Sequence, residues 1–164
     1  MNKKQQNKNK INRKRGSVLV EVLIAAFIIL ITFLILTATL QKSVQLAQAS
    51  LARQQANLLI EEGAEAVKLI RDTSWASITA VPTNTTEYLA FSGGTWAVTS
   101  TPTTIDGFTR TITIADVMRS ATDDIAGSGT LDTGTKKVTV TVSWLLKGTT
   151  QNESLIFYVA DIAS

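Results

Sequence analysis

Cysteine and histidine are both missing from the 164 residues of this chain. Without cysteine there is no thiolate zinc ligand and no thiol nucleophile, and without histidine there is no imidazole to move protons near neutral pH. Proline is also scarce: the two prolines are Pro82 and Pro102, so none interrupts a helix in the first 80 residues. The most common zinc and acid–base sites are therefore excluded, and a long helix is permitted.

Positive charge is confined to one end of the chain. Seven of the 16 lysines and arginines fall within residues 1–16, which contain no acid, so the remainder carries nine basic against 13 acidic residues. A detached basic segment of this kind binds anionic surfaces or sets membrane topology. The formal net charge of +3 therefore describes the leader, not the folded part, and does not indicate a nucleic-acid-binding domain.

The longest uniform feature is an apolar run from Val18 to Leu40, in which 19 of 23 residues are apolar and none is proline or glycine. At 1.5 Å per residue, a helix of this length spans roughly 34 Å, enough to cross the core of a bilayer. A cleavable secretory signal has an apolar core of only about 7–15 residues. Because the positive charges precede the run, we expect a single-pass helix with its N-terminus in the cytoplasm and its C-terminal part outside.

Glu21 is the one ionisable residue in this run. A charge at the centre of a membrane helix costs about 2.5–3.5 kcal/mol on insertion scales, and less near the interface. One interpretation is an interfacial carboxylate that reaches the lipid headgroups. The other is a carboxylate that meets a cation once the helix leaves the lipid.

The residues around Glu21 form a recognisable pattern. A basic leader ends at Arg15-Gly16, Ser17 follows, and Glu21 is the fifth residue after the glycine in an uninterrupted apolar run. This pattern resembles the cleavage and methylation signature of type IV prepilins.

The resemblance implies a processing site, a modification and an assembly contact. A prepilin peptidase is expected to cut between Gly16 and Ser17, with N-methylation of Ser17, and Glu21 is expected to form a salt bridge with the N-terminal amine of a neighbouring subunit. The implied partners are the prepilin peptidase, other pilin subunits, an inner-membrane assembly platform and, before assembly, membrane lipid; no direct nucleic-acid partner is expected. The implied location is the cytoplasmic membrane and then a cell-surface filament.

The pattern becomes amphipathic after the apolar run. Val44, Leu51 and Leu58 recur at seven-residue spacing, while charged residues, including Glu61, Glu62 and Glu65, occupy other positions and are expected on a solvated face. We predict one helix from Ser17 to Arg71. The expected domains are a cleaved basic leader (1–16), a transmembrane or filament-core helix (17–72) and a C-terminal head (73–164).

The head is predicted to be an antiparallel sheet. Strands are expected at 87–91 and 95–99 around a glycine turn, at 108–114 with Arg110 interrupting the apolar stripe, at 137–144 and at 155–159, with a turn over 147–152. The fold class is therefore α+β and pilin-like: one long N-terminal helix, with a protruding apolar half and an amphipathic half, packed under a small antiparallel β-sheet head.

Two features of the head are candidates for ligand binding: its three tryptophans and a loop rich in aspartate. Trp75, Trp96 and Trp144 are expected in the core and not as ligand platforms. A loop with Asp123, Asp124 and Asp132 is a candidate calcium site, although it lacks the spacing of an EF-hand, and a solvated turn is the simpler interpretation. No other metal or cofactor is expected.

Three functions remain open from the sequence. The first is a subunit of a type IV pilus or related pseudopilus, which acts by assembly. The second is a single-pass membrane-anchored surface binding module that does not polymerise. The third is an enzyme, which is not expected because the head shows no convergent catalytic groups.

Overall fold

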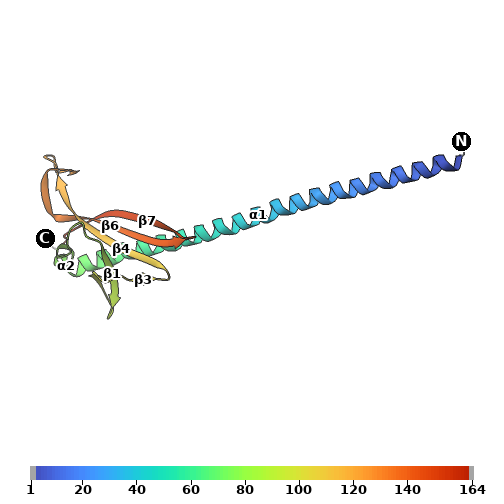
Figure 1. Cartoon of the computed structure of the whole chain (residues 1–164). Coiled ribbons are helices and arrows are strands. Elements are labelled where there is room, and N and C mark those ends of the chain that lie inside the picture. Colours follow the sequence, from blue (N-terminus) through green and yellow to red (C-terminus); the bar gives the residue numbers. More distant parts are fainter. Residues whose placement is uncertain (1–2, 163–164) are drawn as a thin grey trace. The chain divides into compact units, whose positions relative to one another are not determined.

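The computed structural model describes the backbone of residues 3–162 and the side chains of residues 18–162. Figure 1 shows two helices and a set of strands. The helices are α1 (Lys3–Thr73) and α2 (Trp75–Thr79). The strands are β1 (Glu87–Ser92), β2 (Thr95–Thr99), β3 (Thr104–Ile105), β4 (Phe108–Arg119), β5 (Ile125–Ala126), β6 (Thr130–Leu146) and β7 (Thr149–Ala160).

The helix α1 is continuous over 71 residues. Its only glycines are Gly16 and Gly63 and it contains no proline, so nothing in the sequence breaks the backbone ladder. The helix begins earlier than the predicted Ser17, because the lysine-, asparagine- and glutamine-rich leader is also compatible with helix. By its contacts the chain forms two compact units, residues 1–48 and residues 49–164, so α1 contributes to both.

The second unit is an α+β arrangement of the end of α1, the short α2 and one sheet. The sheet has the strand order β2-β1-β4-β6-β7, with β3 and β5 both paired to β4. Every strand pair in the described part of the chain is antiparallel. The predicted combination of one long N-terminal helix with an antiparallel sheet is confirmed at this level.

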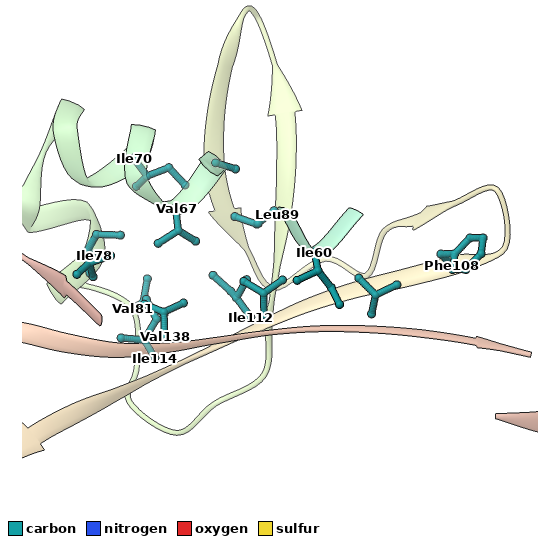
Figure 2. Packing of buried hydrophobic residues seen from close by; sticks show 14 of the residues in the cluster. Ile60, Val67, Ile70, Ile78, Val81, Leu89, Phe108, Ile112, Ile114 and Val138 are labelled. Atoms are coloured by element: carbon teal, nitrogen blue, oxygen red, sulfur yellow. The ribbon is translucent and has the colours of Figure 1, made fainter. Parts of the chain in front are cut away.

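Alternation along β4 and β6 creates the core. Ile112, Ile114, Val138, Val140 and Val142 are fully buried on one face, and the register pairs Ile112 with Val140 and Ile114 with Val138. Figure 2 shows Ile60, Val67 and Ile70 of α1 among these strand residues, together with Ile78 of α2. Trp144 is buried, while Trp75 and Trp96 are partly buried against the same cluster.

The sequence misplaced the last turn and the start of β6. The turn between β6 and β7 consists of Lys147 and Gly148, with φ of 52° and 78°, instead of the predicted 147–152. Both residues have positive φ, as a two-residue type I′ hairpin requires, so β7 starts directly at Thr149. The strand β6 starts at Thr130, seven residues before the predicted start, and its register with β4 shifts between Asp116 and Val117.

Candidate functional site

The apolar half of α1 leaves all of its large side chains exposed. In the stretch from Val18 to Leu40, sixteen valine, leucine, isoleucine and phenylalanine side chains are exposed, from 40% for Ile31 to 70% for Leu19. A helix that is apolar around its whole circumference needs apolar surroundings. Within Val18–Thr73, α1 includes one stretch that is long and apolar enough to cross a membrane.

The polar groups of this stretch are satisfied inside the helix. The hydroxyls of Thr32, Thr37 and Thr39 donate to the carbonyl oxygens of Ile29, Leu34 and Ile35 at 2.8, 2.9 and 2.8 Å. Backbone-bonded hydroxyls of this kind need no water. The three threonines are therefore compatible with an apolar environment, which leaves Glu21 as the polar exception.

The predicted processing residues lie at the edge of what the structure describes. At Gly16 and Ser17 the structure describes only the backbone, which belongs to α1. Glu21 is exposed, and no described side chain of residues 18–162 forms an ion pair with it. Cleavage after Gly16, methylation of Ser17 and pairing of Glu21 remain predictions.

The candidate calcium loop is organised around Arg119 at the end of β4. The Arg119 Nε donates to Asp132 Oδ2 at 2.7 Å, and Nη1 donates to the Asp123 carbonyl oxygen at 2.8 Å. The Asp123 carboxylate lies 3.6 Å from Nε, and Asp124 accepts a bond from the Thr122 hydroxyl at 2.8 Å. The guanidinium therefore occupies the position between two of the three predicted ligands, and a calcium ion would have to displace it.

Among the residues that the structure describes, no three acidic side chains are grouped so as to hold a metal ion. Asp123 and Asp132 are both bound by Arg119, and Asp124 is bound by Thr122, so the loop geometry is explained without a metal. The calcium site remains a prediction that the arrangement does not support.

The Arg119–Asp132 pair makes the stability of this loop pH-dependent. The hydrogen bond from Arg119, helped by bonds from Thr135 and the Gly134 amide, lowers the pKa of Asp132 below its ordinary value, and the same hydrogen bond raises the pKa of Arg119. A carboxyl with a lowered pKa stabilises the fold above its unfolded pKa, about 3.9, and loses that contribution as the pH falls through the lower folded value.

We therefore expect the urea midpoint of the full chain in detergent to fall more steeply below about pH 4 than that of Asp132→Asn. Asp124→Asn is the matched control, because no hydrogen bond joins Asp124 to Arg119 among the described residues. The urea midpoint of this variant should fall below pH 4 as steeply as that of the wild type. If the urea midpoints of the wild type and Asp132→Asn fall equally steeply below pH 4, the Arg119–Asp132 pair is not the source of the pH dependence.

The glycine-containing run from Gly129 to Lys136 resembles a phosphate-binding loop only in the spacing of its glycines. A nucleotide-phosphate loop has the pattern G-x-x-x-x-G-K-[S/T] and joins a strand to a helix, so that backbone amides and the lysine reach the phosphates. Here Gly129 and Gly134 have that spacing, but Thr135 follows the second glycine, and the run leads into β6 and then β7 with no helix.

The polar groups of this run are already engaged within the sheet. The Gly134 amide donates to Asp132 Oδ1 at 2.9 Å, and the Gly134 carbonyl accepts from the Asp161 amide at 2.9 Å. Lys136 Nζ donates to the Asp116 carboxylate. These residues do not fit a nucleoside triphosphate.

The sequence did not predict the ion pair that the buried Arg110 of β4 forms with Glu62 of α1. Arg110 of β4 is 2% exposed; its Nη1 donates to Glu62 Oε2 at 2.8 Å and to the Leu59 carbonyl at 3.2 Å. Its guanidinium lies 5.1 Å from the centroid of the Trp96 ring. Glu62 was expected on a solvated face and is in fact bound to this arginine; the interruption of the apolar stripe at 110 was the only sequence signal.

Comparison with known proteins gives one match. A family model for the terminase large subunit, ATPase domain, matches residues 4–160. No curated protein and no solved structure matches the chain.

This match contradicts several expectations from the sequence. It overturns the assignment to the type IV pilin-like proteins, both non-catalytic functions (pilus subunit and surface binding module) and the expectation that the chain is not an enzyme. It also overturns the expected partners, namely the prepilin peptidase, other pilins and the assembly platform, and the expectation that there is no direct nucleic-acid partner. The architecture and the exposed apolar helix described above do not depend on that match.

The match and the geometry disagree about chemistry. All described strand pairs are antiparallel, and the run nearest in spacing to a phosphate loop is part of a strand. The match covers residues 4–160, so the chain belongs to the terminase large subunit ATPase domain family, although its run from Gly129 to Lys136 does not form a phosphate loop.

Proposed function

We propose that this chain is a single-pass membrane protein, in which the apolar half of α1 is the membrane segment and the sheet head lies outside the cytoplasm. The observation that carries the proposal is the unburied apolar stretch of α1. The seven basic residues before it favour a cytoplasmic N-terminus.

The energetics favour insertion despite Glu21. Each leucine, isoleucine, phenylalanine or valine contributes about −0.3 to −0.6 kcal/mol on the insertion scale, so the sixteen exposed side chains contribute about −5 to −10 kcal/mol. One acid costs at most about 3.5 kcal/mol, and less at the end of the run, where Glu21 is found. The sum stays favourable.

A finer proposal concerns the arrangement and processing of the helix. We propose a pilin-like arrangement, in which α1 has an apolar first half and an amphipathic second half that packs on the sheet. Cleavage after Gly16 would create a new amine on Ser17. In an apolar environment Glu21 is stabilised by an opposite charge, and the new amine on Ser17 is the candidate cation.

Processing is tested by fractionation and mass measurement. We expect the protein in the membrane fraction, starting at Ser17, with or without one methyl group. Gly16→Val should abolish cleavage, leaving a chain that begins at Met1, because the residue before the cut is the one that the signature fixes. Ser17→Ala is the matched control and should still be cleaved.

Two results would overturn the proposal in separate parts. A chain found only in the soluble fraction would exclude the membrane helix. A membrane-bound chain that keeps Met1 in the wild type would retain the anchor and exclude cleavage.

The family match favours a second candidate, ATP hydrolysis. Steady hydrolysis of ATP with Mg²⁺ by the purified full chain, lost in Lys136→Ala, would support that candidate against the geometry. The same rate in the wild type and Lys136→Ala, equal to that of buffer alone, would leave the match without a catalytic counterpart.

A further inference from the structure

An open cleft of about 610 Å³ lies between the open edge of β2 and the helical part of the head. One wall consists of the end of α1, α2 and the segment that follows it, and includes Ile70, Val81 and Pro82. The other wall is the run from Trp96 to Ser100. All of these residues lie within the second compact unit.

Four consecutive residues of β2, Trp96 to Thr99, and the next residue, Ser100, line this cleft. Side chains alternate between the two faces of a sheet, so a cleft on one face would touch every second residue only. Contact with a continuous run is what a cleft along the edge of the strand produces. The strand β2 is at the end of the sheet order and has β1 on one side only.

The register shows which backbone groups point into the cleft. Gly93 and Gly94 form a two-residue turn with positive φ, and Ser92 pairs with Thr95, Ala90 with Ala97 and Tyr88 with Thr99. In such a hairpin these pairs exchange the hydrogen bonds, and the alternate residues direct their amides and carbonyls outward. Trp96 and Val98 therefore present two N–H and two C=O groups at the open edge.

The chemistry of the cleft selects the kind of occupant. Ile70, Val81 and Pro82 provide an apolar wall, and Glu87, at the start of β1, is the one acidic residue in the lining. We propose that an extended peptide segment with alternating apolar residues and one lysine or arginine binds here as an added strand on β2. Its backbone pairs with Trp96 and Val98, and its cation faces Glu87.

A saccharide is the less favourable occupant. Stacking of a sugar requires a free aromatic face, and Trp96 is the only aromatic residue in the lining. The Arg110 guanidinium lies 5.1 Å from the Trp96 ring centroid, and the Phe91 ring lies at 5.1 Å, tilted by 52°. These neighbours occupy the ring, whereas the backbone edge is open.

The test uses the full chain in detergent micelles and a fluorescent peptide, acetyl-Val-Thr-Val-Lys-Val-Thr-amide. We expect saturable binding that Val98→Pro weakens at least about tenfold, because proline removes the outward amide while an edge position tolerates it. Val98→Ala keeps the amide and is the matched control. Glu87→Gln should weaken binding of this peptide but not of the same peptide with glutamine in place of lysine.

A second measurement avoids dependence on the folding of the proline variant. In the wild type, the peptide should slow hydrogen exchange of the Trp96 and Val98 amides, and the same peptide with methylated backbone nitrogens should not. Equal affinity for Val98→Pro and Val98→Ala, unchanged exchange at these two amides, or saturable binding of glucose oligomers in place of the peptide would each overturn the proposal.

Discussion

Replacing Gly129 by alanine is expected to lower the free energy of unfolding by about 3–5 kcal/mol. Gly129 has φ of +146°, a conformation that side chains other than glycine rarely adopt, and an added Cβ would lie 2.0 Å from the Arg119 carbonyl oxygen. That oxygen belongs to the backbone at the end of β4, so it cannot move aside as a flexible side chain would. Urea unfolding of the full chain in detergent measures the change.

Gly127→Ala is the matched control for this prediction. Gly127 lies two residues earlier, and an added Cβ would meet nothing within 4 Å. It is expected to change stability by no more than about 0.5 kcal/mol. If both variants unfold at the same urea concentration, the tight junction between β4 and β6 does not exist in solution.

Breaking the Arg110–Glu62 pair is expected to lower the free energy of unfolding by different amounts, depending on which of the two residues is replaced. Glu62→Ala leaves a buried cation without its carboxylate and should cost about 2–4 kcal/mol, since the Leu59 carbonyl and the Trp96 ring compensate only in part. Arg110→Met replaces the cation by an apolar chain of similar length. Its cost should be smaller, about 0–2 kcal/mol, because the half-exposed Glu62 regains water.

A double-mutant cycle tests this asymmetry by urea unfolding. The combined variant should be no less stable than Arg110→Met alone, which makes the coupling energy close to the full cost of Glu62→Ala. Glu61→Gln, an exposed neighbour, is the control and should stay within about 0.5 kcal/mol of the wild type. A larger cost for Arg110→Met than for Glu62→Ala would show that the arginine acts through packing instead.

The regular parts of the fold were readable from local pattern. The apolar run of α1 and the alternation of Val138, Val140 and Val142 depend only on neighbours in the sequence. The first seven residues of β6 were missed because Thr133 and Gly134 break the alternation where the register with β4 shifts. A shifted register is decided by the partner strand, whose paired residues at the shift are 15 (Val117 and Asp132) and 20 (Asp116 and Lys136) positions away, and it leaves no local period to detect.

The contacts of the head were less predictable than its strands. Arg110 interrupts an apolar stripe, but its partner Glu62 lies 48 residues earlier on a different element. Gly63 explains how the two elements approach, because a Cβ there would meet Arg110 Cδ and Val140 Cγ1 at 2.9 Å. Neither the pair nor the need for this glycine follows from periodicity, since both depend on how α1 packs against the sheet.

The family match and the site geometry also lead to different expectations for ATP. A family match records similarity of sequence, whereas hydrolysis depends on particular atoms at particular distances. Gly134 and Lys136 are the residues that a phosphate would require, and both are bonded within the sheet.

The late position of β7 in the sequence has a consequence for the order in which the contacts of the head form during synthesis. The core of the head joins Ala56 to Ile70 of α1 with strands that extend to Val159, the buried residue near the end of the chain. Contacts between α1 and β7 cannot form until residues up to Val159 have been synthesised. Part of the apolar face of the amphipathic half of α1 therefore stays uncovered until β7 emerges, which makes this interval the one in which a chaperone would be needed.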